Sequence, residues 1–417
     1  KAGQRLLVEF HQHHFGECPA AAPHLGPDRP VRLVLRAEDP DERLMAKSSV
    51  GLLVRPHSIE LVEADGGARS GLLATAIRIP LSGTADDVAL VAAMREALER
   101  LRTKPKRVAV ALPTQEVLLR FFTLPALPKS EWEQAIQFEV RKHIPFRTDE
   151  LVWDYQALEQ RAAKQLDIIF AGVRKDSFER LIRCLAQVGV RPAFIEAQNF
   201  SLARAVAAAY PALRQEMLGV VEVDAEAQAA HIAIVKDGLP YLARDVNLTS
   251  VAGEAESSGG TTADRRAELL LSELRLSLDF FTRKYPVASI ARLLLYGQAD
   301  HTTSLAPWLA LLAQHLPCPV ELGAVALKLP PQAPAGSLPG ISSCGLVLRL
   351  ANPSGPSTDF VTRSKGAAVT PGAVRILQKD SRAFLQSLIK PLAIQALVAA
   401  LVIGLFGMWS QQGASRL

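Results

Sequence analysis

The sequence predicts an α/β body followed by one membrane-spanning helix. Between Val50 and about Leu350, short runs of aliphatic residues alternate with longer runs of helical periodicity, as they do in α/β domains. Near the other end, the run from Pro391 to Trp409 is apolar apart from Gln395. The 417 residues are 49% hydrophobic and 21% charged, values typical of a protein with a buried core.

The expected strands are short, and turn-forming residues separate many of them. They lie at residues 50–54, 59–62, 73–79, 107–112, 117–124, 151–158, 166–173, 219–223, 229–235, 239–245 and 292–296. Two segments share one layout, because residues 50–62 and 220–235 each have the pattern strand, turn, strand. This duplication indicates two related lobes.

Helices are expected between the strands, at residues 85–101, 130–143, 176–188, 200–209 and 267–285. Ser130 and Glu133 have the spacing of a capping box, in which each side chain accepts a hydrogen bond from the other residue's backbone N–H. Gly189 suits a helix C-cap, and Pro211 suits a helix end. Residues 252–264 and 351–370 have the composition of loops or linkers.

Charge and cysteine content exclude several classes of protein. The chain has 47 basic and 42 acidic side chains, a net charge of +5, and no concentrated basic stripe, so we expect no nucleic-acid partner. Cys18, Cys184, Cys318 and Cys344 are far apart and form no CxxC motif. This pattern argues against a disulfide framework and against a cysteine zinc site.

The two ends of the chain predict its topology. Residues 391–409 would span roughly 28 Å as a helix, close to the ~30 Å of a bilayer core. Basic residues precede this run and only Arg416 follows it, so the positive-inside rule places the N-terminal body in the cytoplasm. Residues 1–44 begin with Lys and have no supporting pattern, so we interpret them as a disordered or non-native extension.

The middle of the chain resembles one family. Residues 108–158 contain, in order, Leu112-Pro113, Leu124-Pro125, a glutamate-rich helix, Ile144-Pro145-Phe146 and Asp149-Glu150. This run is similar to PilM, the cytoplasmic actin-like assembly protein of type IV pili. Further similar motifs extend the resemblance over about 300 residues: Arg174-Lys175-Asp176, Gly189-Val190-Arg191-Pro192, Asp237-Gly238-Leu239-Pro240 and residues 345–349.

The resemblance implies an actin-like (ribonuclease H-like) two-lobed ATPase fold with an inserted small α/β subdomain. It implies a cytoplasmic domain at residues 45–350, with the insertion at about 105–195 and the second lobe at about 216–325. A juxtamembrane linker (351–390), the transmembrane helix (391–409) and the start of a truncated periplasmic part (410–417) would follow. This order resembles PilM fused to the start of a PilN-like membrane segment, a layout shared by subunit L of type II secretion.

The implied function is that of an inner-membrane-anchored scaffold that links a cytoplasmic motor to periplasmic subunits of a type IV pilus. The implied partners are PilN-like and PilO-like membrane subunits, the motor ATPase or platform protein, and a second copy of the chain. The implied docking peptide is Asp359, Phe360 and Val361. A type II secretion or competence subunit and an ATP-binding conformational switch of the same family remain open alternatives.

The two hairpin turns are where the resemblance implies a nucleotide's phosphates. The first turn of PilM-like chains resembles Asp-Ile-Gly-Ser-Ser-Ser, but here Leu53, Arg55 and Pro56 replace the acid, the glycine and the next serine. Leucine cannot hold hydrated magnesium, arginine has a Cβ where the turn requires none, and proline has no N–H to donate. Only Ser58 matches.

The second turn resembles Asp-Ile-Gly-Ala and here reads Glu222-Val223-Asp224-Ala225, so that Asp224 would repel a phosphate. One glycine of the adenosine-side pair is retained, as Gly297. We therefore expect a pseudo-ATPase rather than an enzyme, without a metal and with degenerate cofactor positions at Arg55, Ser58, Glu222, Ala225 and Gly297. Arg55 has two interpretations, as a surrogate phosphate ligand or as an ordinary surface arginine.

Overall fold

The computed structural model describes residues 49–64, 73–81, 86–105, 107–160, 164–224, 228–249, 262–285, 288–297, 302–327, 340–353 and 355–366. The expected extension (1–44), membrane helix (391–409) and C-terminal residues (410–417) lie outside these ranges, as does most of the expected linker. Among the described helices, none combines the length and the apolar character needed to cross a bilayer.

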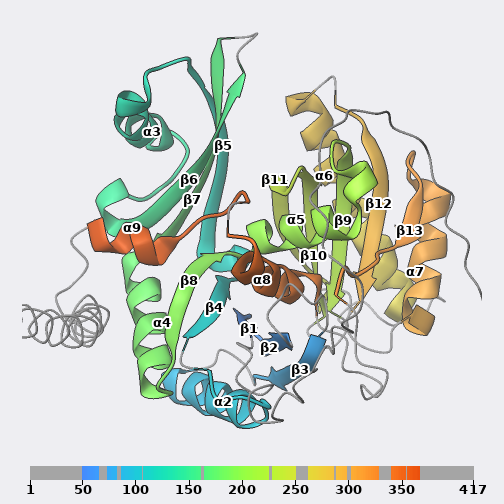
Figure 1. Ribbon diagram of the computed structural model, residues 1–417. Helices are drawn as coiled ribbons and strands as arrows, with labels where there is room; N and C mark the ends of the chain where they lie inside the picture. The colour runs from blue at the N-terminus through green and yellow to red at the C-terminus, as the bar shows by residue number, and fades with distance from the viewer. Residues whose placement is uncertain are drawn as a thin grey trace, which may run out of the picture. The chain divides into compact units, whose positions relative to one another are not determined.

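The first lobe contains a five-stranded sheet of order β3-β2-β1-β4-β8 (Figure 1). Its first three strands are antiparallel neighbours, and the last two run parallel to β1. The strands are β1 (Ser49–Val54), β2 (Ser58–Ala64), β3 (Leu73–Pro80), β4 (Arg107–Leu112) and β8 (Arg191–Ala197). Helices α2 (Asp87–Glu99) and α4 (Lys175–Gln187) pack on each other and on this sheet.

The second lobe repeats this topology, with the order β11-β10-β9-β12-β13. Three antiparallel neighbours are again followed by two parallel strands. The strands are β9 (Met217–Asp224), β10 (Ala229–Lys236), β11 (Leu239–Asn247), β12 (Ile290–Gly297) and β13 (Val320–Leu322), and the helices are α6 (Thr262–Lys284) and α7 (Thr302–His315). One sheet order present twice is the duplicated ribonuclease H-like arrangement, so the expected actin-like fold is confirmed.

A small subdomain is inserted between β4 and β8. Its three-stranded antiparallel sheet has the order β5-β7-β6 and is joined by α3. The elements are β5 (Val117–Pro125), α3 (Trp132–Val140), β6 (Leu151–Gln160) and β7 (Gln165–Arg174). Phe170 and Ile136 belong to a separate apolar cluster inside this subdomain.

Helices α5 (Gln198–Ala209) and α8 (Ile341–Ala351) cross each other between the two sheets. α5 contacts β10 and β11 of the second lobe and β4 and β8 of the first, and α8 contacts β1, β2 and β4 of the first. Their crossing is close, because a Cβ added to Gly345 would lie 1.8 Å from the carbonyl oxygen of Ser201. On its other side α8 meets β1, where a Cβ on Gly51 would lie 2.8 Å from Leu346 Cβ.

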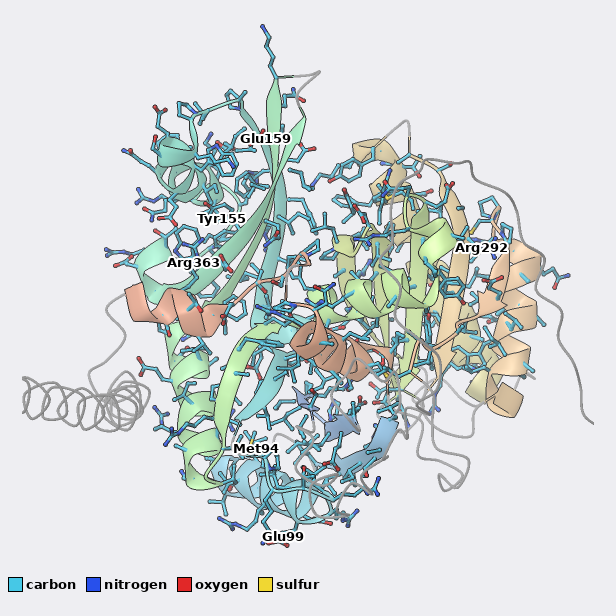
Figure 2. All side chains as sticks on the ribbon, in the orientation of Figure 1. Met94, Glu99, Tyr155, Glu159, Arg292 and Arg363 are labelled. Atoms are coloured by element: carbon cyan, nitrogen blue, oxygen red, sulfur yellow. The ribbon has the colours of Figure 1, made fainter. Side chains whose placement is uncertain are left out.

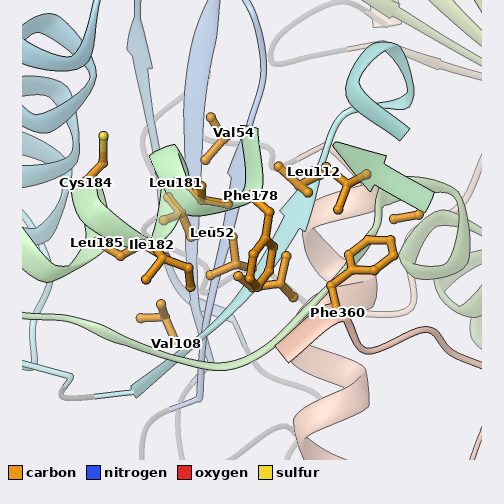
Figure 3. Packing of buried hydrophobic residues seen from close by; sticks show 14 of the residues in the cluster. Leu52, Val54, Val108, Leu112, Phe178, Leu181, Ile182, Cys184, Leu185 and Phe360 are labelled. Atoms are coloured by element: carbon orange, nitrogen blue, oxygen red, sulfur yellow. The ribbon is translucent and has the colours of Figure 1, made fainter. Parts of the chain in front are cut away.

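Residues 355–366, expected within a linker, pack on the body and end in α9 (Phe360–Gly366). α9 contacts β6 and β8. The side chain of Phe360 is fully buried and joins the apolar cluster that contains Phe178 and Leu112 (Figure 3). The packed body therefore extends beyond residue 350.

Local signals in the sequence had mixed outcomes. The strands expected from the pattern are present, and Gly189 ends α4 with a positive φ of 75°. The capping box at Ser130 is wrong, because Ser130 lies in a 3₁₀ turn (Lys129–Glu131) and α3 begins at Trp132 without a side-chain cap. The elements not expected from the sequence are β8, β13, α7, α8 and α9.

We predict that Gly345→Ala destabilises the protein by about 3 kcal/mol, although alanine is the better helix former by ~1 kcal/mol. The reason is the backbone of Ser201, which cannot move aside as a flexible side chain can. Gly355→Ala is the matched control, because a Cβ there meets nothing within 4 Å. Urea denaturation of both variants provides the measurement, and equal midpoints would contradict the close crossing of α5 and α8.

Candidate functional site

Arg55 joins the two lobes at the place where the hairpin turns meet. It lies in the turn between β1 and β2, which is closed by a hydrogen bond from the Arg55 N–H to the carbonyl of Ser58 (2.8 Å). The Arg55 Nη2 is 2.9 Å from Oε2 of Glu222 on β9, and its Nε is 3.3 Å from Oε1 of Glu60 on β2. One guanidinium therefore binds a carboxylate from each lobe.

This ion cluster is buried. The side chain of Arg55 is 12% exposed, that of Glu60 is 5% exposed and that of Glu222 is 1% exposed. Burial alone would lower the pKa of Arg55, but the carboxylates of Glu222 and Glu60 outweigh it and hold the pKa above its ordinary value. Arg55 is therefore a charged internal residue and not a surface arginine.

The N-terminus of α8 binds the same two carboxylates. Ser343 Oγ donates to Glu60 Oε2 at 2.6 Å, and Ser342 Oγ donates to Glu222 Oε2 at 3.2 Å. A Cβ on Gly340 would lie 2.6 Å from Glu222 Oε1 and 2.7 Å from Glu60 Oε2, so a larger residue there would displace these carboxylates. A helix N-terminus attracts anions, and here two side-chain carboxylates occupy the place that a phosphate would use.

A second ion pair crosses between the lobes nearby. Nη2 of Arg78 on β3 lies 2.7 Å from Oδ2 of Asp224 at the end of β9. The sequence suggested that Asp224 would repel a phosphate, and the structure places an arginine from the other lobe against it. This pairing makes Asp224 part of the lobe interface.

A histidine cluster also spans the lobes. Nδ1 of His231 on β10 is 2.6 Å from Oδ1 of Asp245 on β11. From the first lobe, Thr114 Oγ1 lies 3.4 Å from the same nitrogen and donates to Asn199 Oδ1 at 2.7 Å. His231 is buried, and within the described part of the chain its Nε2 has no hydrogen-bond partner. The contacts of Nδ1 therefore link strand β10 to Asp245 on β11 and to Thr114 of the first lobe.

A cleft lies between the hairpins, with about 450 Å³ of empty space that includes open solvent. Its lining combines the two clusters with neighbouring turn and amide residues: Arg55, Pro56, His57, Pro113, Gln115, Gln198, Glu222, Asp224, Ala229, Ala230, His231 and Asp245. Within the described ranges, no group of three or more His, Cys, Asp or Glu side chains could hold a metal ion.

The residues of this cleft do not fit magnesium and ATP. Glu222, the acid that the second turn retains, is engaged by Arg55 and Ser342. In the first turn, the N–H of Arg55 bonds to the Ser58 carbonyl, and Pro56 has none. Glu222 Oε2 and the backbone N–H of Arg55 are therefore already bound to other groups of the protein.

The structure brings some of the expected cofactor positions together. Arg55 and Glu222 are in contact, and Ser58 is fully buried beside them in β2. Gly297 ends β12 in parallel register with Val223, and Ala225 lies outside the described residues.

Sequence reasoning missed Glu60, Gly340, Ser342, Ser343 and Arg78. The position of Glu60 opposite Leu53 in the hairpin was the available signal, since a charge there faces a buried strand.

A second buried cluster holds the start of the C-terminal segment (residues 355–366). Arg204 binds both oxygens of Glu196, at 2.8 and 2.9 Å, and Arg349 Nη1 binds Glu196 Oε2 at 2.8 Å. The same Arg349 nitrogen donates to the carbonyl of Thr358 (2.7 Å), and Arg204 Nη2 donates to the carbonyl of Pro356 (3.1 Å). Backbone carbonyls of the segment thus accept hydrogen bonds from both arginines that bind Glu196.

Polar contacts also fix α9 to the inserted subdomain. Asp154 on β6 accepts from the backbone N–H of Asp359 at 2.8 Å and from Arg363 Nε at 2.7 Å. Arg363 pairs with Glu133 of α3 as well, and its guanidinium lies 5.2 Å from the ring centre of Tyr155 (Figure 2). Of the three expected docking residues, Asp359 caps α9 through its side chain, whereas Phe360 and Val361 are buried.

Comparison with known proteins supports the fold. A family model described as type IV pilus assembly protein PilM matches residues 57–249. A solved PilM-PilN type IV pilus biogenesis complex is 20% identical, covers 74% of this chain and 100% of that chain, and has a TM-score of 0.58. A second solved structure is the cytoplasmic domain of EpsL, an inner membrane component of the type II secretion system of Vibrio cholerae. The match covers 76% of this chain and 98% of that chain, with 10% identity and a TM-score of 0.40. The chain has a PilM-like, actin-like fold.

We predict that Arg55→Met destabilises the protein by about 3–5 kcal/mol, because it leaves two buried carboxylates without their cation. Glu222→Gln should cost less in that background than in the parent protein, since it removes one of the unpaired charges. Arg147→Met is the control, because its ion pair with Asp149 is exposed to solvent and should contribute little to stability. Urea denaturation compares Arg55→Met, Glu222→Gln, the double variant and Arg147→Met with the parent protein, and additive losses would contradict the cluster.

Proposed function

We propose that this protein is an inner-membrane-anchored, PilM-like scaffold of a type IV pilus assembly platform and a pseudo-ATPase. The observation that carries the proposal is the guanidinium of Arg55 held between Glu60 and Glu222 on a PilM-like fold. The cation and the anions of the cleft are all supplied by the chain itself. Such a protein acts through its interfaces and not by turning over a nucleotide.

The energetics of the cleft favour this proposal over an ATP-binding switch. Binding of magnesium and ATP would have to separate Arg55 from Glu222 and bring four phosphate charges close to Glu60, Glu222 and Asp224. Breaking a buried ion pair costs several kcal/mol, and like charges at short range repel strongly in a buried site. The PilM-like fold would then be retained for the relative placement of its two lobes.

The partner proposed for this fold is a PilN-like membrane protein, because the similar solved structure is a complex of PilM with PilN. In this chain we assign the docking role to the segment that contains Asp359, Phe360 and Val361, which packs on the inserted subdomain in cis. A covalent link raises the effective concentration of a docking peptide and makes its association intramolecular. PilO-like subunits and the pilus motor or platform protein complete the proposed assembly.

We predict that the full chain, purified in detergent, gives no binding heat with up to millimolar magnesium-ATP in isothermal titration calorimetry. The reason is that Arg55, Glu222 and the N-terminus of α8 already bind one another. The same titration is carried out on the triple variant Leu53→Asp, Arg55→Gly, Pro56→Ser, because this variant restores the residues of the PilM-like first turn. Micromolar affinity of the parent chain would refute the pseudo-ATPase proposal.

We also predict that the full chain remains in the membrane fraction after washing with high salt and carbonate. Deletion of residues 391–409 should release it, because this run is the proposed anchor. Deletion of residues 371–389 is the control of equal length and should leave the protein in the pellet. A full chain that appears in the carbonate supernatant would show that residues 391–409 do not anchor it.

A further inference from the structure

We propose that α8 couples the ion cluster between the lobes to the docking of the C-terminal segment. The helix has eleven residues and would span roughly 16 Å. Its first turn binds the Arg55 cluster, and its last turn binds the Glu196 cluster. A change at one end of the helix then alters the contacts at the other.

The first turn of α8 is a full member of the Arg55 cluster. Ser342 and Ser343 donate one hydrogen bond each to the carboxylates that bind Arg55. Both carboxylates also lie beside Gly340, where they fill the space that a Cβ would take. Removal of the Arg55 charge would leave these carboxylates repelling each other at a helix end that is built to hold them.

The last turn of α8 holds the C-terminal segment through Arg349. This side chain is buried, stacks on Phe194 with its guanidinium carbon 3.8 Å from the ring centre, and binds both Glu196 and the Thr358 carbonyl. Thr358 is itself fully buried and accepts a hydrogen bond from the N–H of Ala197. One residue further on, Asp359 begins the contacts that seat α9 on β6.

The middle of α8 leaves little space for the helix to absorb a displacement. Gly345 lies against the backbone of α5, and Leu346 lies against the backbone of β1 at Gly51. A close-packed interior transmits a shift and does not damp it. The helix should therefore move as a unit, and the coupling must be reciprocal, so that release of α9 also loosens the contacts of Ser342 and Ser343.

A thiol at position 364 tests this coupling. The Ser364 hydroxyl is buried in α9 and donates to the Val361 carbonyl, so Ser364→Cys is a small change that reports undocking of α9. The full chain in detergent would carry Cys18→Ser in every variant, and labelling by a maleimide would be followed by mass spectrometry. Buried Cys184 reports global unfolding in the same sample.

We expect Arg55→Ala to raise the labelling rate of Cys at position 364 at least fivefold, and more than that of Cys184. Ser343→Ala, which removes only a hydroxyl from the first turn of α8, should raise it at least twofold. If Arg55→Ala labels Cys184 as rapidly as position 364, the protein has unfolded and Ser343→Ala decides the result.

Two arginine variants test whether α8, and not another contact in the protein, couples the ion cluster to the docking of α9. Arg78→Ala removes the second ion pair between the lobes, at Asp224, and keeps Arg55, Ser342 and Ser343, whereas Arg292→Ala removes an ion pair with Glu321 inside the second lobe. Both should change the labelling rate at position 364 by less than twofold. The proposal is overturned if Ser343→Ala has no effect, or if Arg78→Ala releases α9 as strongly as Arg55→Ala does.

Discussion

The placement of one cation between two buried acids organises this protein. Arg55 lies in a turn of the first lobe, Glu60 lies on β2 and Glu222 lies on β9 of the second lobe, and burial of these charges depends on their pairing. Two serine hydroxyls in the first turn of α8 donate to the same acids, at the helix end that favours negative charge. The hairpins, the lobe interface and α8 are thereby fixed in one arrangement.

The ion cluster at the opposite end of α8 contains more cations than acids. There one buried acid, Glu196, binds two arginines, and the excess positive charge is offset by backbone carbonyls at Pro356 and Thr358. Each cluster takes its neutralising groups from a different part of the chain, so neither can form until distant elements have packed. This dependence explains why residues 355–366, which have the composition of a linker, belong to the folded body.

The sequence was informative where the controlling physics is local. Alternation of apolar residues located the strands of both hairpins, and Gly189 indicated a helix end because glycine tolerates a positive φ. It was uninformative where burial overrides composition. β8 contains Pro192 and the charged Glu196, and α8 contains Gly345, features that argue against a strand and a helix when the tertiary partners are unknown. The replacement of Asp by Leu53 and of Gly by Arg55 predicted a damaged phosphate turn, but the partner of Arg55 lies in another lobe and had no sequence signal.

The docking of α9 has a mechanical consequence. A chain that leaves a domain through a flexible linker can transmit only tension, because it bends under any other load. Here the exit is fixed at several points, by Arg349 at Thr358, by Asp154 at Asp359 and Arg363, and by the buried ring of Phe360. A segment held at separated points can also resist twisting, so that torque applied after residue 366 would reach both lobes.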